Sequence, residues 1–170
     1  MDNILRNKWL LADYDIFLKD CESFEYQASG HGGQKVNRKY SAIKVVHIPT
    51  KLSAYSSDTR SQNLNKQHSV NKIKFLIALK IRMQNIEDII DFMELNKPNS
   101  IKSFREAIWI AIVLDLLTEF QFDNKKVAEI IGISVSQLIK ILYDNKIIWQ
   151  LVNNNRLRLG MNKLFSSKKR

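Results

Sequence analysis

Residues 29–37 read Ser-Gly-His-Gly-Gly-Gln-Lys-Val-Asn, and this stretch holds three of the five glycines in a chain of 170 residues. Glycine adopts positive φ angles that most residue types avoid, so backbone freedom is concentrated at one place. A short aromatic-rich stretch, Phe24 to Gln27, precedes it, and a run rich in β-branched residues, Ser41 to Ile48, follows it. The pattern predicts extended segments on both sides of a glycine-rich loop.

The chain on either side of this stretch predicts a small sheet with helices. The β-branched run stops at Pro49, and residues 52–56 can return antiparallel with Pro49-Thr50-Lys51 as a hairpin connection. Residues 4–19 predict one helix. Residues 64–82 predict a second helix, apolar on one face and basic on the other, where its cations are Lys66, Lys72, Lys74, Lys80 and Arg82. We therefore expect an α+β fold with a small antiparallel sheet, and we assign residues 1–82 to this first domain.

The remainder of the chain is expected to be an all-α region. Residues 83–124 form a helical spacer with an apolar stripe from Ile86 to Met93. Ser103 and Glu106 have the spacing of a capping box before an apolar run that continues to about residue 120. That run is apolar nearly all round, which predicts a helix at the centre of a helical core.

Residues 125–170 predict a basic helix-turn-helix-like module followed by a tail. A small residue, Ala128, stands where two helices approach, Gly132 suits the turn, and Leu138 locks the second helix onto the first. Ser134 and Gln137 have the spacing of a capping box. Residues 147–159 predict a wing-like hairpin that turns at three consecutive asparagines.

Charge is distributed unevenly along a chain whose net charge is +10. Residues 30–82 carry eleven basic side chains and one acidic one, and residues 125–170 carry ten basic and two acidic ones. Residues 83–124, between them, carry three basic and eight acidic side chains. Two basic blocks beside an acidic spacer favour a nucleic acid contacted at two places over a merely solvated face.

The composition also predicts where the protein works. Cys21 is alone, which rules out an intramolecular disulfide and favours a reducing compartment. The densest apolar run, residues 107–114, is far shorter than the ~20 residues that span a bilayer. The first residues lack the basic and apolar regions of a signal peptide. We expect a cytoplasmic protein without a membrane partner.

The glycine-rich stretch resembles the catalytic-domain signature of the class I peptide chain release factors and the related ribosome-rescue hydrolases. The resemblance covers roughly residues 22–80 and keeps the order and spacing of that signature. A bare Gly-Gly-Gln arises often by chance, whereas a string of linked blocks is specific. The further blocks are Ser41-Ala42-Ile43, His47-Ile48-Pro49-Thr50, Arg60-Ser61-Gln62 and Asn63-Leu64-Asn65-Lys66.

The resemblance implies hydrolysis of the peptidyl-tRNA ester, with the ribosomal large-subunit RNA at the peptidyl-transferase centre and the P-site peptidyl-tRNA as partners. No Ser-His-Asp set is apparent, and the histidines and Cys21 lack metal-ligand spacing, so neither metal nor cofactor is expected. Gly32 and Gly33 let the backbone approach the RNA 3′ end, and the N–H of Gln34 can donate to the developing oxyanion. The resemblance makes that N–H the catalytic element and gives the glutamine side chain the task of admitting water.

Neighbouring residues are expected to bind RNA or the ribosome, mainly through sequence-independent phosphate contacts. For Arg60-Ser61-Gln62, a plain helix N-cap at Ser61 is an alternative. His47 is expected to pack in a strand, and the three tryptophans are expected in cores rather than as stacking platforms. The expected contacts are Lys35, Asn37, Arg38, Lys39, Arg60, Ser61, Gln62, Asn65, Lys66, Lys140, Arg156 and Arg158.

Departures from the family shape the functional hypothesis. No segment resembles a stop-codon reader, so we expect a protein that releases chains from stalled ribosomes without reading a codon. We expect it to be a monomer that its basic C-terminal module anchors to the ribosome. Thr50-Lys51 stands where the family usually has Thr-Gly. Two alternatives remain: a helix-turn-helix DNA-binding protein in which the Gly-Gly-Gln domain is a non-catalytic RNA-binding scaffold, or C-terminal helices that merely extend the core.

Overall fold

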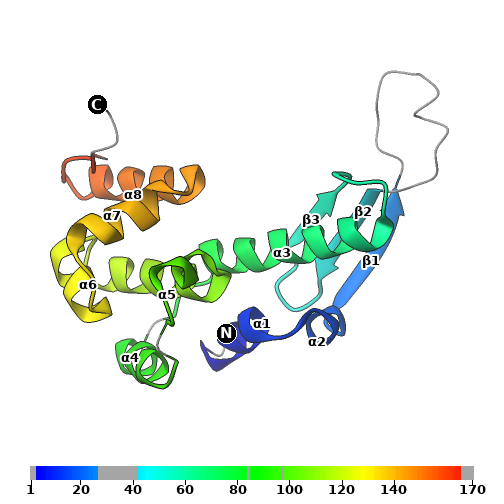
Figure 1. Cartoon of the computed structure of the whole chain (residues 1–170), viewed down its shortest axis with the longest axis horizontal. Helices are drawn as coiled ribbons and strands as arrows, with labels where there is room; N and C mark the ends of the chain where they lie inside the picture. Colours follow the sequence, from blue (N-terminus) through cyan, green and yellow to red (C-terminus); the bar gives the residue numbers. More distant parts are fainter. Residues whose placement is uncertain (1–2, 27–41, 84, 97, 166–170) are drawn as a thin grey trace. The chain divides into compact units, whose positions relative to one another are not determined.

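The computed structural model describes residues 3–26, 42–83, 85–96 and 98–165 (Figure 1). The chain divides into two compact units, Met1–Lys80 and Ile81–Arg170. The first unit contains a three-stranded antiparallel sheet with helices, and the described part of the second is helical. The expected α+β class is therefore confirmed. The predicted segments 83–124 and 125–170 both lie in the second unit, and the division between them stays a prediction.

The sheet of the first unit has the strand order β1-β2-β3. The strands are β1 (Cys21–Tyr26), β2 (Ala42–His47) and β3 (Ser53–Ser56), which confirms the predicted extended segments and the hairpin after Pro49. Lys51, in the hairpin connection, has a φ of 57°. This left-handed conformation favours glycine, which accounts physically for the Thr-Gly that the resemblance leads one to expect there.

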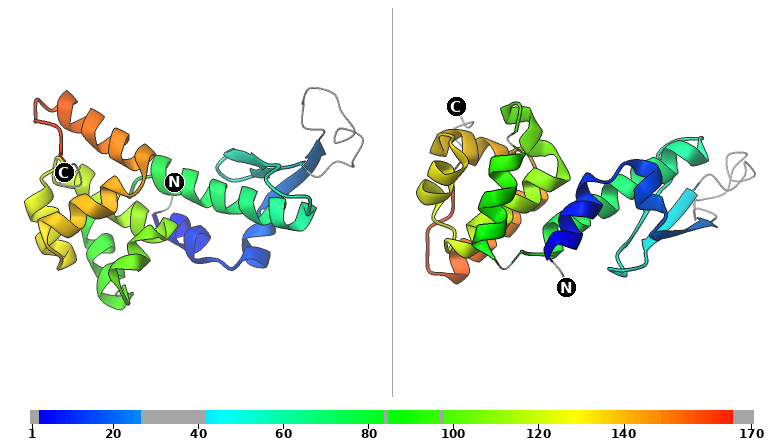
Figure 2. Two further views of the ribbon diagram at one scale, coloured as in Figure 1. Left: turned by 45° about the horizontal axis from the view of Figure 1, so that its top comes forward. Right: turned by 90° about the horizontal axis from the view of Figure 1, so that it is seen from below.

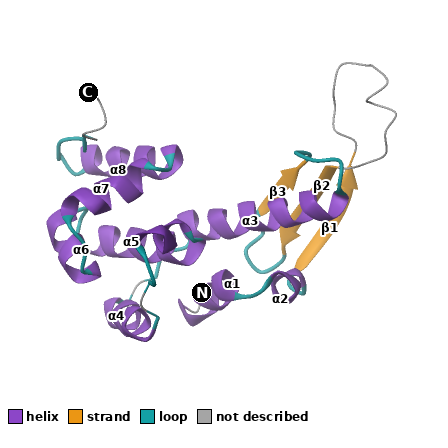
Figure 3. Ribbon diagram, viewed as in Figure 1, coloured by secondary structure: helices purple, strands orange, loops and turns teal. Residues whose placement is uncertain are grey.

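Helix α3 (Gln62–Lys80) packs on β2 and β3 (Figure 3). Its inward face buries Val70, Ile73 and Ile77, and the Ser69 hydroxyl donates a hydrogen bond to the Ile43 carbonyl at 3.0 Å. This side chain ties the helix to the central strand.

The predicted basic face of this helix is only partly correct. The Lys74 ammonium donates to the Leu10 and Ala12 carbonyls and lies 5.2 Å from the centre of the Phe17 ring. Lys74 thus bonds to carbonyls within the first unit and is not part of an exposed basic face. Arg82 lies beyond the end of this helix and belongs to the second unit, where it forms an ion pair with Asp115.

The single helix predicted over residues 4–19 is wrong. The chain forms α1 (Asn3–Leu11) and α2 (Tyr14–Leu18), with Asp13 extended between them. The break leaves the Leu10 and Ala12 carbonyls free to accept from Lys74 and lets Trp9 and Phe17 pack on the same histidine. Tertiary contacts therefore override the helical periodicity.

The second unit is built around α5 (Ala107–Glu119), in which every residue from Ile108 to Leu117 is buried. This confirms the predicted central helix. The unit begins with α4 (Ile86–Leu95) and the 3₁₀ helix η1 (Ile101–Arg105). Within α5 the buried Asp115 carboxylate accepts from Arg82 Nη1 at 2.9 Å and from the Met83 N–H at 3.2 Å.

The helix-turn-helix pattern is confirmed by α6 (Asn124–Ile131) and α7 (Val135–Tyr143). Gly132 joins them with a φ of 76°. The Ser134 hydroxyl accepts from the Gln137 N–H at 3.2 Å, and the Gln137 side chain accepts from the Ser134 N–H at 2.8 Å. The capping box is thus present, and α7 packs against both α6 and α8 (Figure 2).

Two predictions in this unit are wrong. Residues predicted as a wing-like hairpin form one helix, α8 (Lys146–Arg158), because Ile148 and Val152, four residues apart, both enter the core. The predicted capping box at Ser103 is absent, since Ser103 lies inside η1 and Glu106 caps α5 without a side-chain bond.

The tryptophans follow the core prediction only in part. Trp9 and Trp109 are buried, whereas Trp149 is half-buried and packs edge-on against Tyr143. None of the helices in the described ranges has both the length and the apolar character needed to cross a bilayer.

Candidate catalytic and RNA-binding site

The catalytic candidates Gly32, Gly33 and Gln34 lie outside the described residues, as do Lys35, Asn37, Arg38 and Lys39. The structure does describe the two strands that flank residues 27–41. Tyr26 ends β1, Ala42 begins β2, and these two residues are Cα partners in the antiparallel ladder. Both ends of this segment are therefore held side by side at one end of the sheet (Figure 1).

The strand that anchors this segment is the most buried one in the sheet. Ala42 and Ile43 at its start are 1% and 5% exposed, and Val45 is fully buried. The Ser69 hydroxyl bonds to the Ile43 carbonyl one residue from the anchoring point. A chain segment that starts from such a packed strand begins from a rigid support.

The β3–α3 connection is held together by Asn65. Its Oδ1 accepts from the Thr59 N–H at 2.9 Å and from the Thr59 hydroxyl at 3.0 Å, and its Nδ2 donates to the Thr59 carbonyl at 2.8 Å. The Ser61 N–H donates to the Thr59 hydroxyl oxygen at 3.1 Å. One buried side chain thus fixes the turn that presents residues 60–62.

Ser61 is the N-cap of α3, because its hydroxyl accepts from the Leu64 N–H at 3.4 Å. The helix-cap alternative is therefore confirmed for Arg60-Ser61-Gln62. These three residues are also exposed, and Lys66 is half-buried one turn further on. Asn65 is different: its side chain is fully buried, so it positions Thr59 and does not offer a surface for direct RNA contact.

Asp58, which the sequence analysis did not single out, organises the opposite side of the same connection. Its Oδ2 accepts from the Ser56 hydroxyl at 2.6 Å and from the Lys72 ammonium at 3.1 Å, and His68 Nδ1 lies 3.4 Å away. The Ser56 and Lys72 hydrogen bonds lower the pKa of Asp58. A signal for it existed: Asp58 is the one acidic residue in the basic block 30–82.

His47 packs as a strand histidine, as expected. The ring stacks on Phe17 at 4.9 Å, meets Trp9 edge-on at 4.7 Å, and its Nδ1 bonds to the Thr50 hydroxyl at 2.8 Å. Burial lowers the pKa of His47. It pairs with Cys21 at the end of the ladder opposite Ala42, roughly 17 Å along the strand at about 3.3 Å per residue.

The predicted contacts in the basic module divide into exposed and structural residues. Lys140 and Arg158 are exposed. The Arg156 guanidinium instead donates to the Phe122 carbonyl at 2.6 Å and to the Asn162 carbonyl at 3.0 Å. Phe122 has a φ of 61°, so Arg156 supports a strained turn after α5. Arg156 is half-buried, and its RNA contact stays a prediction.

Comparison with known proteins places this geometry in a family. The RF-1 domain matches residues 11–105. Peptide chain release factor 1 of Acholeplasma laidlawii is 37% identical over 75 residues, which are 44% of this chain and 21% of the relative. Peptide chain release factor 2 of Aeromonas hydrophila is 41% identical over 76 residues, which are 44% of this chain and 21% of the relative.

A third relative extends the match in this chain. Peptide chain release factor 2 of Thermotoga petrophila is 30% identical over 97 residues, which are 55% of this chain and 26% of the relative. The chain thus spans about a fifth to a quarter of the length of the curated relatives it matches. Because the RF-1 domain match covers more than half of the chain and includes Gly32-Gly33-Gln34, the chain belongs to the RF-1 domain family.

Proposed function

We propose that this protein hydrolyses the ester bond of peptidyl-tRNA on the ribosome and so releases nascent chains. The observation that carries the proposal is the Gly32-Gly33-Gln34 sequence inside an RF-1 domain match, on a segment whose ends are paired at Tyr26 and Ala42. The relatives over this region are named peptide chain release factors, which supports the same activity.

The proposed chemistry needs positioned dipoles and no strong base. Water attacks the ester carbonyl, the bond to the terminal ribose oxygen breaks, and that oxygen leaves with a proton. The Gln34 N–H donates a hydrogen bond to the negative charge that develops, and a preorganised donor of this kind contributes about 3–4 kcal/mol. Gly32 and Gly33 have no Cβ, which permits close approach to the tRNA 3′ end.

Exposed side chains beside the sheet supply the proposed RNA contacts. Arg60 and Gln62 stand at the start of α3, held by the Asn65–Thr59 bonds, and Lys66 follows on the same helix. Such contacts with phosphate and ribose fix orientation and weaken as salt rises. Asn65 is a positioning residue in this scheme.

We further propose that release is independent of the codon and rescues stalled ribosomes. Helices α6, α7 and α8 and the residues that follow α8 expose cations, which support this proposal. These cations suit phosphate-directed anchoring. The exposed cations are Lys125, Lys126, Lys140, Lys146, Arg158 and Lys163.

The DNA-binding alternative is supported by the helix-turn-helix arrangement of α6 and α7, but other features of this region do not favour it. Helix α7 would be the recognition helix, but Lys140 is its one basic residue. Gln137, which would otherwise be available to read a base, is used in the capping box. The predicted wing is a helix that packs on α7.

Peptide release from defined ribosome complexes tests the catalytic proposal. Gln34→Pro removes the backbone N–H and should lower the rate of release by about 10²–10³ while ribosome binding is kept. Gln34→Ala is the matched control, since it keeps the N–H and should retain far more activity. Release by Gln34→Pro at the unaltered rate would refute the catalytic role of this amide.

The anchoring role is tested by charge reversal, because deleting residues 125–170 would strip α5 of the helices that bury it. Lys140→Glu with Arg158→Glu should weaken ribosome binding and reduce the slope of log affinity against log salt by about two. Lys19→Glu, exposed in the first unit, is the control. A salt slope equal to that of the control would remove Lys140 and Arg158 from the interface.

A further inference from the structure

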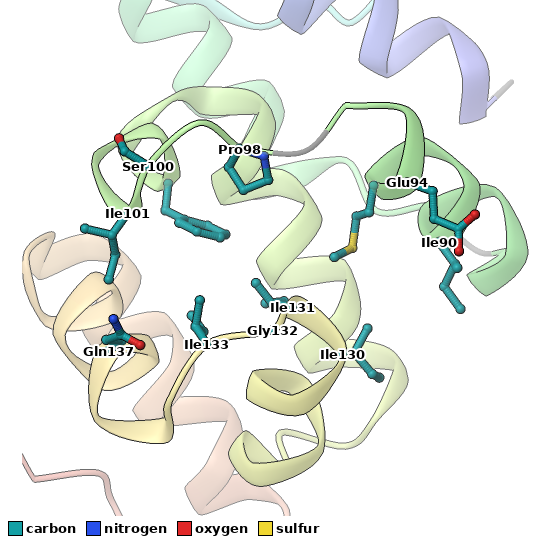
Figure 4. Close-up of a pocket in the computed structure, with 12 residues that line it drawn as sticks. Ile90, Glu94, Pro98, Ser100, Ile101, Ile130, Ile131, Gly132, Ile133 and Gln137 are labelled. Carbon is teal, nitrogen blue, oxygen red and sulfur yellow. The ribbon is translucent and has the colours of Figure 1, made fainter.

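The second unit contains a groove of about 460 Å³ that the catalytic proposal does not use. It is bounded by α4, by the Pro98–Phe104 segment, and by the turn between α6 and α7 (Figure 4). Apolar side chains from all of these elements line it, and their sequence positions span more than forty residues. The main ones are Ile90, Met93, Ile101, Phe104, Ile131 and Ile133.

The floor and the rim of this groove differ in exposure. Phe104 is 3% exposed, whereas Ile90 and Ile101 at the rim are 38% and 40% exposed. In Figure 4 Ile101 and Ile133 lie on two different elements at the edge of the groove, the Pro98–Phe104 segment and the turn between α6 and α7. Exposed isoleucines around a preformed apolar groove are typical of a site that receives apolar side chains of a partner.

The α4 side of the groove is acidic. Glu94 lines it with the carboxylate directed away from the hollow (Figure 4). Glu87 lies one turn before Ile90 on the same helix, and this spacing puts the two residues on one side of it. Asp88 and Asp91 complete four carboxylates on ten residues. Within the described residues none of the four forms an ion pair, in a chain whose net charge is +10.

Helix stability explains only part of this acidity. Glu87 and Asp88 stand in the first turn of α4, where negative charge interacts favourably with the helix dipole. Glu94 stands in the last turn, where the same interaction is unfavourable, and that turn has no basic residue. The helix dipole therefore does not account for Glu94, which lines the groove, and the four carboxylates of α4 together suit a cationic partner.

We propose that this groove docks an amphipathic, Lys- and Arg-rich helical segment of a partner protein. Apolar side chains of that segment, at spacings of three and four residues, enter between Ile90 and Ile101. Its cations face the α4 carboxylates, and the same carboxylates repel RNA phosphates. The proposal stands apart from peptidyl-tRNA hydrolysis and uses no residue of the proposed catalytic segment.

The test uses the full chain and a fluorescent synthetic peptide of about 16 residues, roughly four helical turns, with leucines on one face and lysines elsewhere. Fluorescence anisotropy should show saturable binding. Ile101→Glu should weaken it at least about tenfold, since an apolar contact is replaced by a charge. Ile147→Glu is the matched control: Ile147 lies on α8, is 54% exposed and does not line the groove.

Charge is tested separately from shape. Glu87→Lys with Glu94→Lys should weaken binding of the lysine peptide and let a matched leucine–glutamate peptide bind instead, whereas Glu119→Lys, exposed at the end of α5, should change neither. Moving from 0.1 M to 1 M salt shortens the screening length from about 10 Å to about 3 Å and should also weaken binding.

Three results would overturn the proposal. The first is equal binding of the lysine and glutamate peptides to the unaltered chain. The second is an affinity that Ile101→Glu leaves unchanged while circular dichroism shows an intact fold. The third is a different occupant: an RNA oligonucleotide, or a second copy of the chain detected by sedimentation, whose binding Ile101→Glu abolishes.

Discussion

The strongest structural prediction concerns Asn65, the buried residue that fixes the β3–α3 connection. Its amide makes three hydrogen bonds to Thr59, of 2.8, 2.9 and 3.0 Å, and its side chain is fully buried. Asn65→Ala removes all three bonds, so the Thr59 N–H and carbonyl must form hydrogen bonds with water instead. The turn that presents Arg60 and Ser61 then loses its support.

The expected cost follows from these contacts. Each hydrogen bond contributes about 0.5–1.5 kcal/mol net, which gives about 1.5–4.5 kcal/mol for three. Alanine regains roughly 0.5 kcal/mol of helix propensity, so the free energy of unfolding should fall by about 1–4 kcal/mol. For a unit of this size each kcal/mol lowers the Tm by about 4–8 °C, so a decrease of at least about 4 °C is expected.

The assay is thermal and urea unfolding of the full chain, followed by peptide release at a temperature where the variant remains folded. Asn71→Ala is the matched control, because Asn71 is exposed on the same helix and gains the same propensity. Asn65→Ala should also release peptide more slowly than this control. A Tm within about 2 °C of the control, roughly half a kcal/mol, would show that the Thr59 bonds contribute little.

Two further predictions concern buried ionisable groups. Burial lowers the pKa of His47, so near and below the unfolded pKa of about 6.5 the folded state binds fewer protons than the unfolded state. The contribution of His47 to the free energy of unfolding should therefore be fully present above that pH and fall as the pH drops below it. The Tm measured between pH 8 and 5 should depend less on pH in His47→Leu than in the unaltered chain. Unchanged acid sensitivity in His47→Leu would assign the effect to other groups. Asp115→Ala removes the carboxylate that accepts hydrogen bonds from Arg82 and from the Met83 N–H, and it should lower the free energy of unfolding in urea by about 3–5 kcal/mol. Glu119→Ala, at an exposed position on the same helix, should change it by almost nothing. Equal losses in the two variants would contradict the stabilising role of the Arg82–Asp115 pair.

Short-range signals made several elements predictable from the sequence. The strands on both sides of residues 27–41, the hairpin after Pro49, and the Ser134–Gln137 capping box all depend on residues that are neighbours along the chain. Gly132, at a φ of 76°, occupies a conformation that the turn requires and that glycine adopts without strain. Local propensity and tertiary structure agree at these positions.

Two cations whose surroundings the sequence does not reveal, Lys74 and Arg156, bond to partners that are distant in sequence. Lys74 reads as part of an exposed basic face, but carbonyls more than sixty residues earlier accept its protons. Arg156 reads as an RNA contact, but the Phe122 carbonyl, 34 residues earlier, accepts from its guanidinium. A lysine or arginine that bonds to interior carbonyls cannot be recognised from the sequence, since its position on the helix looks the same as that of an exposed lysine or arginine.

The amino-acid sequence by itself determined the family, the α+β class and the position of the Gly-Gly-Gln segment, because these depend on residue order and local spacing. The tertiary structure decided which polar residues face solvent: Arg60 and Lys140 do, whereas Asn65 and Arg156 bond to the interior. It also brought Ile90, Ile101 and Ile133 together around one groove. The reason is physical, since burial and hydrogen-bond partners depend on which surfaces meet after folding.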